Sequence, residues 1–199
     1  MKHALWKRAA SHSGRHLDEH QLGLLDRFEY WLATEAVEAG GIGPAEQERI
    51  ARRHIGDSLV FATPLPENPV SVWDLGSGAG LPGIPLAILM PDTRIRLIDR
   101  SARRVDLLRR AIRILDLPNV VACQSELRSG SDYPDVLVTR ATLSAEKTAR
   151  LVETRLPATD LVIQGGSWRS RPGHRGWVTL EIPASVLDQT VWLLIMRRQ

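Results

Sequence analysis

Residues 70–83, with the sequence VSVWDLGSGAGLPG, constrain the fold more than any other part of the chain. The apolar alternation that leads to Asp74 predicts a strand entering a sheet interior. Three glycines then stand at every second position, which lets the backbone turn sharply and approach a ligand closely. Pro82 stands where a helix can begin, because its missing N–H would have no partner there. The segment therefore predicts a strand, a glycine turn and a helix start whose open N–H groups favour a polar or anionic ligand.

The chain after residue 70 alternates between strand and helix patterns, which predicts an α/β fold. We expect helices at 82–90, 101–115 and 143–155, and strands at 70–76, 94–99, 120–125, 135–139, 160–164, 176–182 and 191–196. Parallel neighbours need a crossover of a dozen or more residues, and the link between the last two strands is shorter. These data predict a mostly parallel, seven-stranded sheet with helices on both faces and an antiparallel ending.

The region before residue 70 predicts helices rather than a separate domain. Residues 1–16 show no periodic pattern, and we expect a flexible tail there. Residues 17–39 and 45–61 carry apolar side chains at helical spacing. We therefore expect a single domain over 17–199, with a helical cap at 17–63 and an α/β body at 70–199.

Composition narrows the class of protein. The net charge of +3 permits a nucleic-acid partner without requiring one, and arginine, which suits phosphates and bases, supplies 23 of the 26 basic residues. A genomic preference for arginine would give the same bias. No apolar run reaches the roughly 18 residues of a membrane span, so we expect no membrane partner. The single cysteine excludes an internal disulfide and suits a reducing compartment. We expect a cytoplasmic monomer.

The glycine turn leaves two cofactors open. Residues 78–83 match the dinucleotide fingerprint G-x-G-x-x-G, and Asp99 ends the next strand, where an acid accepts hydrogen bonds from ribose hydroxyls. Nicotinamide and S-adenosylmethionine (SAM) sites share that geometry, and Asp99 could also simply cap the next helix. Asp74 favours SAM, because a carboxylate below the loop suits a cationic methionine end better than a pyrophosphate. The antiparallel ending also favours SAM. The predicted cofactor loop comprises Asp74, Gly76, Ser77, Gly78, Gly80 and Leu81.

Several short motifs are shared with one family. They are Leu-Pro-Gly-Ile-Pro at 81–85, Leu-Ile-Asp at 97–99, Leu-Pro-Asn-Val at 117–120, Arg-His-Ile-Gly-Asp-Ser at 53–58 and Thr-Arg-Ala at 139–141. Over residues 52–165 the chain resembles the glucose-inhibited division protein B family, bacterial methyltransferases that form 7-methylguanine in 16S ribosomal RNA. The resemblance implies a class I SAM-dependent methyltransferase with a Rossmann-like sheet, SAM as cofactor, and 16S ribosomal RNA or the 30S subunit as partner.

The resemblance also implies site residues. It places cofactor contacts at Gly76, Leu81 and Arg140, a ribose contact at Asp99, and contacts just after the third strand at Leu127 and Arg128. The family usually has an acid at the position of Arg128, and Glu126 is an alternative partner for the adenine amine. Further departures are Gly-Gly-Ile-Gly-Pro at 40–44 in place of Tyr-Asn-Leu-Thr, and Gln-Gly at 164–165 in place of Lys-Gly. These changes lie on the expected substrate side, which makes the chain a divergent member.

Candidate substrate contacts are basic or aromatic. Arg103 and Arg104 begin the helix at 101–115 and could grip phosphates, although a solvated basic face explains them equally well. The loop at 167–177 carries Trp168, Arg169 and Arg171, a composition that suits stacking on unpaired RNA bases. His54 and Asp57 lie three residues apart, as a helix-packing pair or as part of a lid over the cofactor. We expect no metal site.

The expected reaction needs no strong base. Guanine N7 carries no proton, so catalysis comes mainly from positioning, and Arg140 is the one residue predicted to assist it. A surface arginine that caps the next helix is the alternative interpretation of Arg140. Other hypotheses for the chain are a methyltransferase of a small molecule or another RNA, a non-catalytic SAM- or RNA-binding paralogue, and a nicotinamide oxidoreductase.

Overall fold

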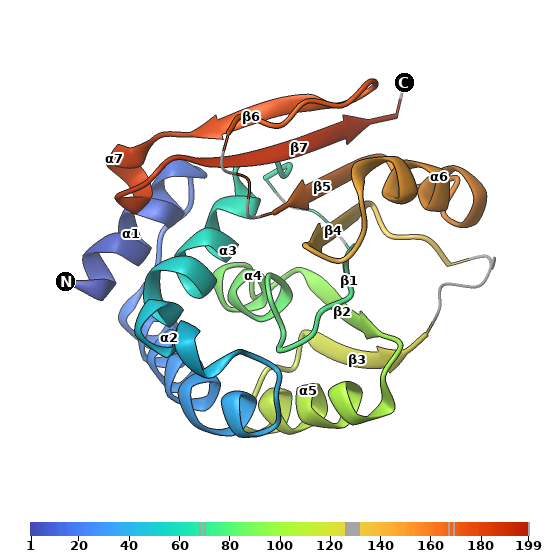
Figure 1. Cartoon of the computed structure of the whole chain (residues 1–199). Coiled ribbons are helices and arrows are strands. Elements are labelled where there is room, and N and C mark those ends of the chain that lie inside the picture. The colour runs from blue at the N-terminus through green and yellow to red at the C-terminus, as the bar shows by residue number, and fades with distance from the viewer. Residues whose placement is uncertain (68, 70, 126–131, 167, 169, 199) are drawn as a thin grey trace.

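The strands form one sheet with the order β3-β2-β1-β4-β5-β7-β6 (Figure 1). The computed structural model describes residues 1–67, 69, 71–125, 132–166, 168 and 170–198. The strands are β1 Ser71–Leu75, β2 Arg94–Asp99, β3 Val120–Gln124, β4 Val136–Arg140, β5 Leu161–Gly165, β6 Val178–Ile182 and β7 Val191–Arg197. The first five are parallel, whereas β7 runs antiparallel to both β5 and β6. The predicted mixed sheet is confirmed.

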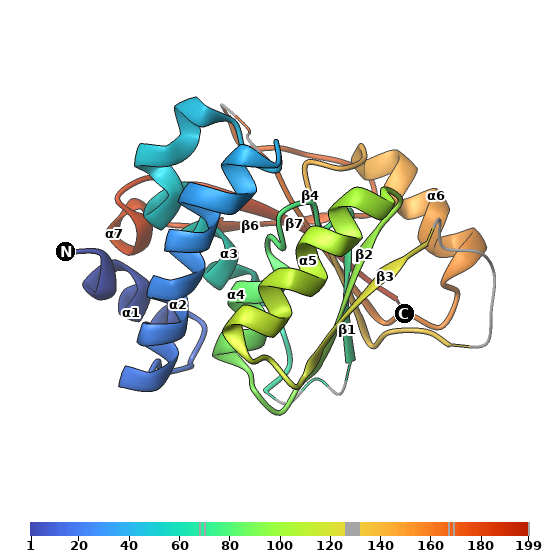
Figure 2. The same ribbon diagram turned by 90° about the horizontal axis from the view of Figure 1, so that it is seen from below.

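Helices cover both faces of this sheet. They are α1 Lys2–His12, α2 Glu19–Trp31, α3 Asp57–Leu59, α4 Gly83–Leu89, α5 Ala102–Leu115, α6 Ala145–Arg155 and α7 Ala184–Leu187. Figure 2 shows α2 and α5 side by side on one side and α6 on the other. Alternate side chains of a strand point to opposite faces. Val72 therefore belongs to the larger core under α2, α4 and α5, and Trp73 to the smaller core under α6.

The N-terminal residues correct one prediction. Where the sequence predicts a flexible tail over 1–16, residues Lys2–His12 form α1. Leu5, Trp6, Ala9 and Ala10 are buried at helical spacing, and the Trp6 indole N–H donates to the Ala51 carbonyl at 2.8 Å. Small alanines among basic residues make a weak apolar pattern, so this helix is visible only through its packing. Helix α1 packs against α3, α7 and the helical segment Ile50–Gly56.

The second cap helix is also less regular than the sequence predicts. Residues 45–61 stay helical, but their hydrogen-bond pattern changes from a 3-10 helix at Pro44–Arg49 to a π-helix at Ile50–Gly56. The short α3 and a further 3-10 turn at Val60–Ala62 follow. No helix within the described residues is long and apolar enough to cross a membrane.

Candidate functional site

The glycine turn connects β1 to α4 at the carboxyl edge of the sheet. Gly76, Gly78 and Gly80 have φ values of +72°, +58° and +88°, which strain any side chain larger than glycine. A Cβ at Gly76 would lie 2.4 Å from Thr142, and one at Gly80 would lie 2.4 Å from Ile84. Two of the three glycines are therefore required by close packing as well as by backbone conformation.

Asp74 and Ser77 hold this turn from beneath. The buried Asp74 carboxylate accepts the Gly83 N–H at 2.9 Å, which fixes the start of α4. The Ser77 hydroxyl donates to the Asp74 carbonyl at 2.8 Å and accepts the Ile98 N–H at 3.0 Å. Burial raises the pKa of Asp74 to about 7 against the opposing effect of the Gly83 hydrogen bond. Both side chains support the loop and leave its outer surface to a ligand.

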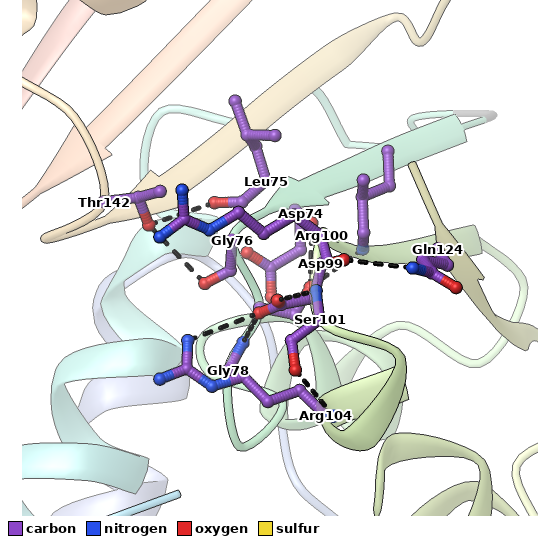
Figure 3. Close-up of polar contacts among 12 residues, drawn as sticks. Asp74, Leu75, Gly76, Gly78, Asp99, Arg100, Ser101, Arg104, Gln124 and Thr142 are labelled. Carbon is purple, nitrogen blue, oxygen red and sulfur yellow. Dashed lines mark hydrogen bonds and ion pairs between the residues drawn. The ribbon is translucent and has the colours of Figure 1, made fainter. Parts of the chain in front are cut away.

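Asp99 ends β2 directly beside the turn, as Figure 3 shows. One carboxylate oxygen accepts the Gly78 N–H at 3.1 Å, and the other accepts the Ser101 N–H at 2.9 Å. Arg104 lies 3.7 Å from the same carboxylate. Helix α5 is capped by the Ser101 hydroxyl, which accepts the Arg104 N–H, so Asp99 is not the helix cap. The acid is thus held in place while each of its oxygens keeps a lone pair for a further donor.

A cleft of about 570 Å³ opens along this edge, and we refer to it as the cofactor cleft. Its wall consists of Leu75, Gly76, Ile98, Asp99, Arg100, Arg104, Ser125, Arg140, Ala141, Thr142, Leu143 and Leu151. The apolar side chains suit an adenine ring, and the Asp99 carboxylate suits the two hydroxyls of a ribose. Gly76 has no side chain in this part of the wall, where an added Cβ would collide with Thr142. The residues present therefore fit SAM.

Arg140 joins the sheet to the helical cap. It lines the cofactor cleft, and its guanidinium donates to the Arg53 and His54 carbonyls at 3.3 and 3.4 Å. The guanidinium also lies 3.1 Å from His54 Nδ1, which must accept because arginine only donates. The interpretation of Arg140 as a surface cap of the next helix is wrong, since Ser144 caps α6.

Burial shifts several pKa values around Arg140. Desolvation lowers the pKa of His54 to about 4, helped by the positive charge of Arg140. Desolvation raises the pKa of Asp57 to about 6, although Arg140 and Arg53 oppose it. Burial also lowers the pKa of Arg140 itself, against the charges of Asp57 and Asp74. His54 is therefore neutral near pH 7, and it forms a hydrogen-bonded contact between cap and sheet.

A second hollow of about 460 Å³ adjoins the cofactor cleft, and we refer to it as the Trp168 hollow. The two share Ala141, Thr142 and Leu143. Its wall also includes Ser144, Ala145, Lys147, Gln164, Gly165, Gly166, Trp168, Pro172, Gly173, His174 and Leu194. An indole, a cation and a buried amide in one cavity suit a planar polar ring.

The structure separates the predicted cofactor residues into three groups. Gly76, Asp99 and Arg140 line the cofactor cleft. The others in the loop support it from within, among them Asp74, Ser77, Gly78, Gly80 and Leu81. Residues Glu126, Leu127 and Arg128 lie outside the described residues.

The predicted substrate residues are also divided. Arg104 lines the cofactor cleft rather than a separate phosphate site, Arg103 is exposed on α5, and Trp168 lines the Trp168 hollow. Arg171 is exposed, and Arg169 lies outside the described residues. Sequence reasoning missed Thr142, which contacts Gly76. Its only signal is its position just after the strand that pairs with β1.

The fold and the site together define a class. The chain has a glycine turn after the central strand, an acid that ends the neighbouring strand, and an antiparallel final pair of strands. This arrangement is typical of class I SAM-dependent methyltransferases. A family model described as GidB, rRNA small subunit methyltransferase G, matches residues 21–167. The chain belongs to this family, whose cofactor is SAM.

Curated relatives support the same assignment. Proteins named ribosomal RNA small subunit methyltransferase G from Acidothermus cellulolyticus and Mycolicibacterium gilvum are 35% and 43% identical, over 82% and 80% of this chain. The alignments cover 70% and 69% of those relatives. The protein of that name from Mycobacterium marinum is 39% identical over 65% of this chain and 58% of its own length. The chain thus matches between 58% and 70% of the length of these three relatives.

Solved structures show the fold alone. A mutant of MtNAS in complex with S-adenosylmethionine superposes with a TM-score of 0.58 at 15% identity, covering 90% of this chain and 75% of that chain. The 23S rRNA methyltransferase ErmE superposes with a TM-score of 0.52 at 14% identity, covering 71% and 67%. The predicted methyltransferase fold is confirmed.

Proposed function

We propose that this chain transfers a methyl group from SAM to N7 of a guanine in 16S ribosomal RNA. Family membership supports the ribosomal substrate. The observation that carries the proposal is the cofactor cleft with its fixed Asp99 carboxylate, which shares three wall residues with a second hollow large enough for a base. When bound, SAM supplies an electrophilic methyl group that the lone pair of N7 attacks.

The residues of this chain contribute position rather than proton transfer. Asp99 and the glycine turn hold the cofactor end of the reaction, and Trp168 offers a stacking surface to the acceptor base. Arg140, in the wall of the cofactor cleft, connects the sheet to the cap through hydrogen bonds to Arg53 and His54. Because N7 carries no proton, a site without a general base is sufficient for this reaction.

Transfer of tritiated methyl from SAM tests the proposal. The protein is incubated with tritiated SAM and one of three acceptors: 30S subunits, free 16S RNA or a small-molecule extract. We expect label in the 16S ribosomal RNA of the 30S subunits. Label that enters only small molecules would contradict the ribosomal substrate. A protein that binds SAM but labels nothing would be a non-catalytic paralogue. As a check on the cofactor, SAM should raise the melting temperature and NAD should not.

A further inference from the structure

A third cavity shares Gly166 and Trp168 with the Trp168 hollow, and we refer to it as the Asp57 pocket. Its volume is about 280 Å³, and its wall consists of Arg53, Asp57, Gly166, Trp168, Gln189, Thr190, Val191 and Trp192. These residues come from the π-helix Ile50–Gly56, the start of α3, the end of β5 and the start of β7. None of the functions discussed above uses this pocket.

Three of the wall residues carry a buried polar atom without a hydrogen-bond partner. These atoms are Arg53 Nε, Asp57 Oδ1 and Trp192 Nε1. Arg53 Nε lies 3.8 Å from the other Asp57 oxygen, too far for a hydrogen bond. A buried polar group without a partner costs about 1–3 kcal/mol, so three such groups in the wall of one cavity favour binding of a ligand with matching polar groups. The three unpaired atoms are two N–H donors and one carboxylate acceptor, and Gln189, also in the wall, donates a hydrogen bond to the Asp57 carboxylate.

The reacting atom dictates which edge of guanine remains for recognition. N7 must face the methyl group, so the base has to be identified through N1–H, the N2 amine and O6. N1–H and the amine are donors that a carboxylate accepts, whereas O6 accepts from an N–H group. This complement is the one that Asp57, Arg53 and Trp192 provide.

We propose that the Asp57 pocket reads the N1–N2 edge of the acceptor guanine, with Asp57 as the acceptor and Arg53 and Trp192 as donors to O6. The inference rests on the proposed function, because it takes guanine N7 as the reacting atom. It makes Asp57 a specificity-determining residue and gives the Arg-His-Ile-Gly-Asp-Ser helix a role in choosing the base.

The pocket is connected to the reaction site through shared residues. Gly166 and Trp168 belong to both the Asp57 pocket and the Trp168 hollow, which in turn shares three residues with the cofactor cleft. Arg140, in the wall of the cofactor cleft, donates to the carbonyl of Arg53. The N1–N2 edge lies opposite N7 on the purine, so a guanine held at Asp57 leaves N7 free toward the cleft.

Replacing guanosine by inosine tests this assignment, because inosine lacks only the N2 amine. Small subunits are reconstituted from 16S RNA that carries either nucleoside at the methylated position, and kcat/KM is measured with tritiated SAM. We expect the wild-type protein to prefer guanosine by about 5- to 150-fold, the discrimination of a well-placed base contact. Asp57→Asn should reduce this preference to less than about threefold, because an amide presents only one acceptor.

Two further variants separate recognition from folding. Asp188→Asn makes the same chemical change one residue from Gln189, but Asp188 pairs with Arg8 outside the pocket and should keep the wild-type preference. Trp192→Phe keeps a ring and removes the indole N–H. Since O6 is present in both bases, Trp192→Phe should lower kcat/KM about 5- to 10-fold for guanosine and inosine alike.

The outcomes distinguish this inference from the proposed function. Equal wild-type rates on the two RNAs, or an undiminished preference in Asp57→Asn, would overturn the Asp57 pocket while leaving the methyltransferase assignment intact. If Asp57→Asn fails to fold, an unchanged rate for Trp192→Phe would overturn it instead. A wild-type protein that labels neither RNA would refute both proposals.

Discussion

Asp99 is the residue on which the cofactor assignment depends most. Its two oxygens already accept the Gly78 and Ser101 N–H groups, so its carboxylate is fixed before any ligand arrives. We predict that Asp99→Ala weakens SAM binding by about 1–3 kcal/mol, the cost of losing a charged hydrogen-bond acceptor. Isothermal titration measures this change directly.

The control for Asp99 is its neighbour. Ser101→Ala removes the cap of α5 but keeps the Ser101 N–H that Asp99 accepts. It should lower the unfolding free energy by about 0.5–2 kcal/mol and leave SAM affinity unchanged. If Asp99→Ala binds SAM as tightly as the wild type, Asp99 is not part of the cofactor site.

His54 gives a pH-dependent prediction. Its pKa is about 4 in the folded protein and near 6.5 when unfolded, so the unfolded state takes up more protons between these values. The contribution of neutral His54 to the free energy of unfolding is therefore fully present above pH 6.5 and is lost as the pH falls toward 4. Relative to His54→Asn, whose amide oxygen still accepts from Arg140, the wild type should lose about 1–2 kcal/mol between pH 7 and 4.5, since part of the ring stays exposed.

Urea unfolding of both proteins at the two pH values measures this difference. Asp57 has a pKa of about 6 and contributes in the opposite direction, but it is present in both proteins and largely cancels. Parallel stability curves for the wild type and His54→Asn would show that His54 titrates normally.

Residue roles were predictable where they follow from strand ends. Asp99 and Arg140 end parallel strands, so the sequence places them at the ligand edge. Asp74 was expected to face a methionine end, but it shares the strand face of Val72 and reaches Gly83 inside the loop. Strand alternation predicts that Asp74 and Val72 lie on the same face of β1. It does not predict that the glycine turn folds back over this face and brings the Gly83 N–H to Asp74.

At the scale of elements, the glycine turn is built for one conformation. Gly76→Ala places a Cβ 2.4 Å from Thr142 at a φ of +72°. We predict a loss of about 1–3 kcal/mol in unfolding free energy, together with at least about a tenfold loss of SAM affinity, because the cleft wall itself moves. Thermal unfolding and titration with SAM measure the two effects.

Gly43→Ala is the matched control for the turn. Gly43 has a φ of −67° and no atom within 4 Å of an added Cβ, so the change should stay within about 0.5 kcal/mol. A Gly76→Ala protein as stable and as competent in binding as Gly43→Ala would refute the close-packing account of the turn.

Helix α1 is the longer of two helices that the sequence did not predict, the other being α7. Trp6 is fully buried and donates to the carbonyl of Ala51 in the π-helix of the cap. Trp6→Ala should cost about 3–5 kcal/mol, as truncation of a buried aromatic does, whereas Ser11→Ala on the exposed side should change little. Urea unfolding compares them. Equal stability would restore the interpretation of residues 1–16 as a flexible tail.

For the whole molecule, the sequence predicted the sheet better than the cap. Strand and helix patterns after residue 70 follow from strict apolar periodicity, and the short final connection forces the antiparallel ending. The cap depends on contacts between distant segments, such as Arg140 with His54, which no local pattern contains. The cofactor cleft was therefore foreseeable, and the Trp168 hollow and Asp57 pocket beside it were not.

The whole arrangement leads to one chemical product. The cofactor cleft, the Trp168 hollow and the Asp57 pocket form a continuous series through shared wall residues. The most direct test incubates the protein and SAM with 30S subunits that lack the modification, and identifies the methylated nucleoside by mass spectrometry. We predict 7-methylguanosine at a single position of 16S ribosomal RNA. A methyl group on any other atom or base would contradict the account.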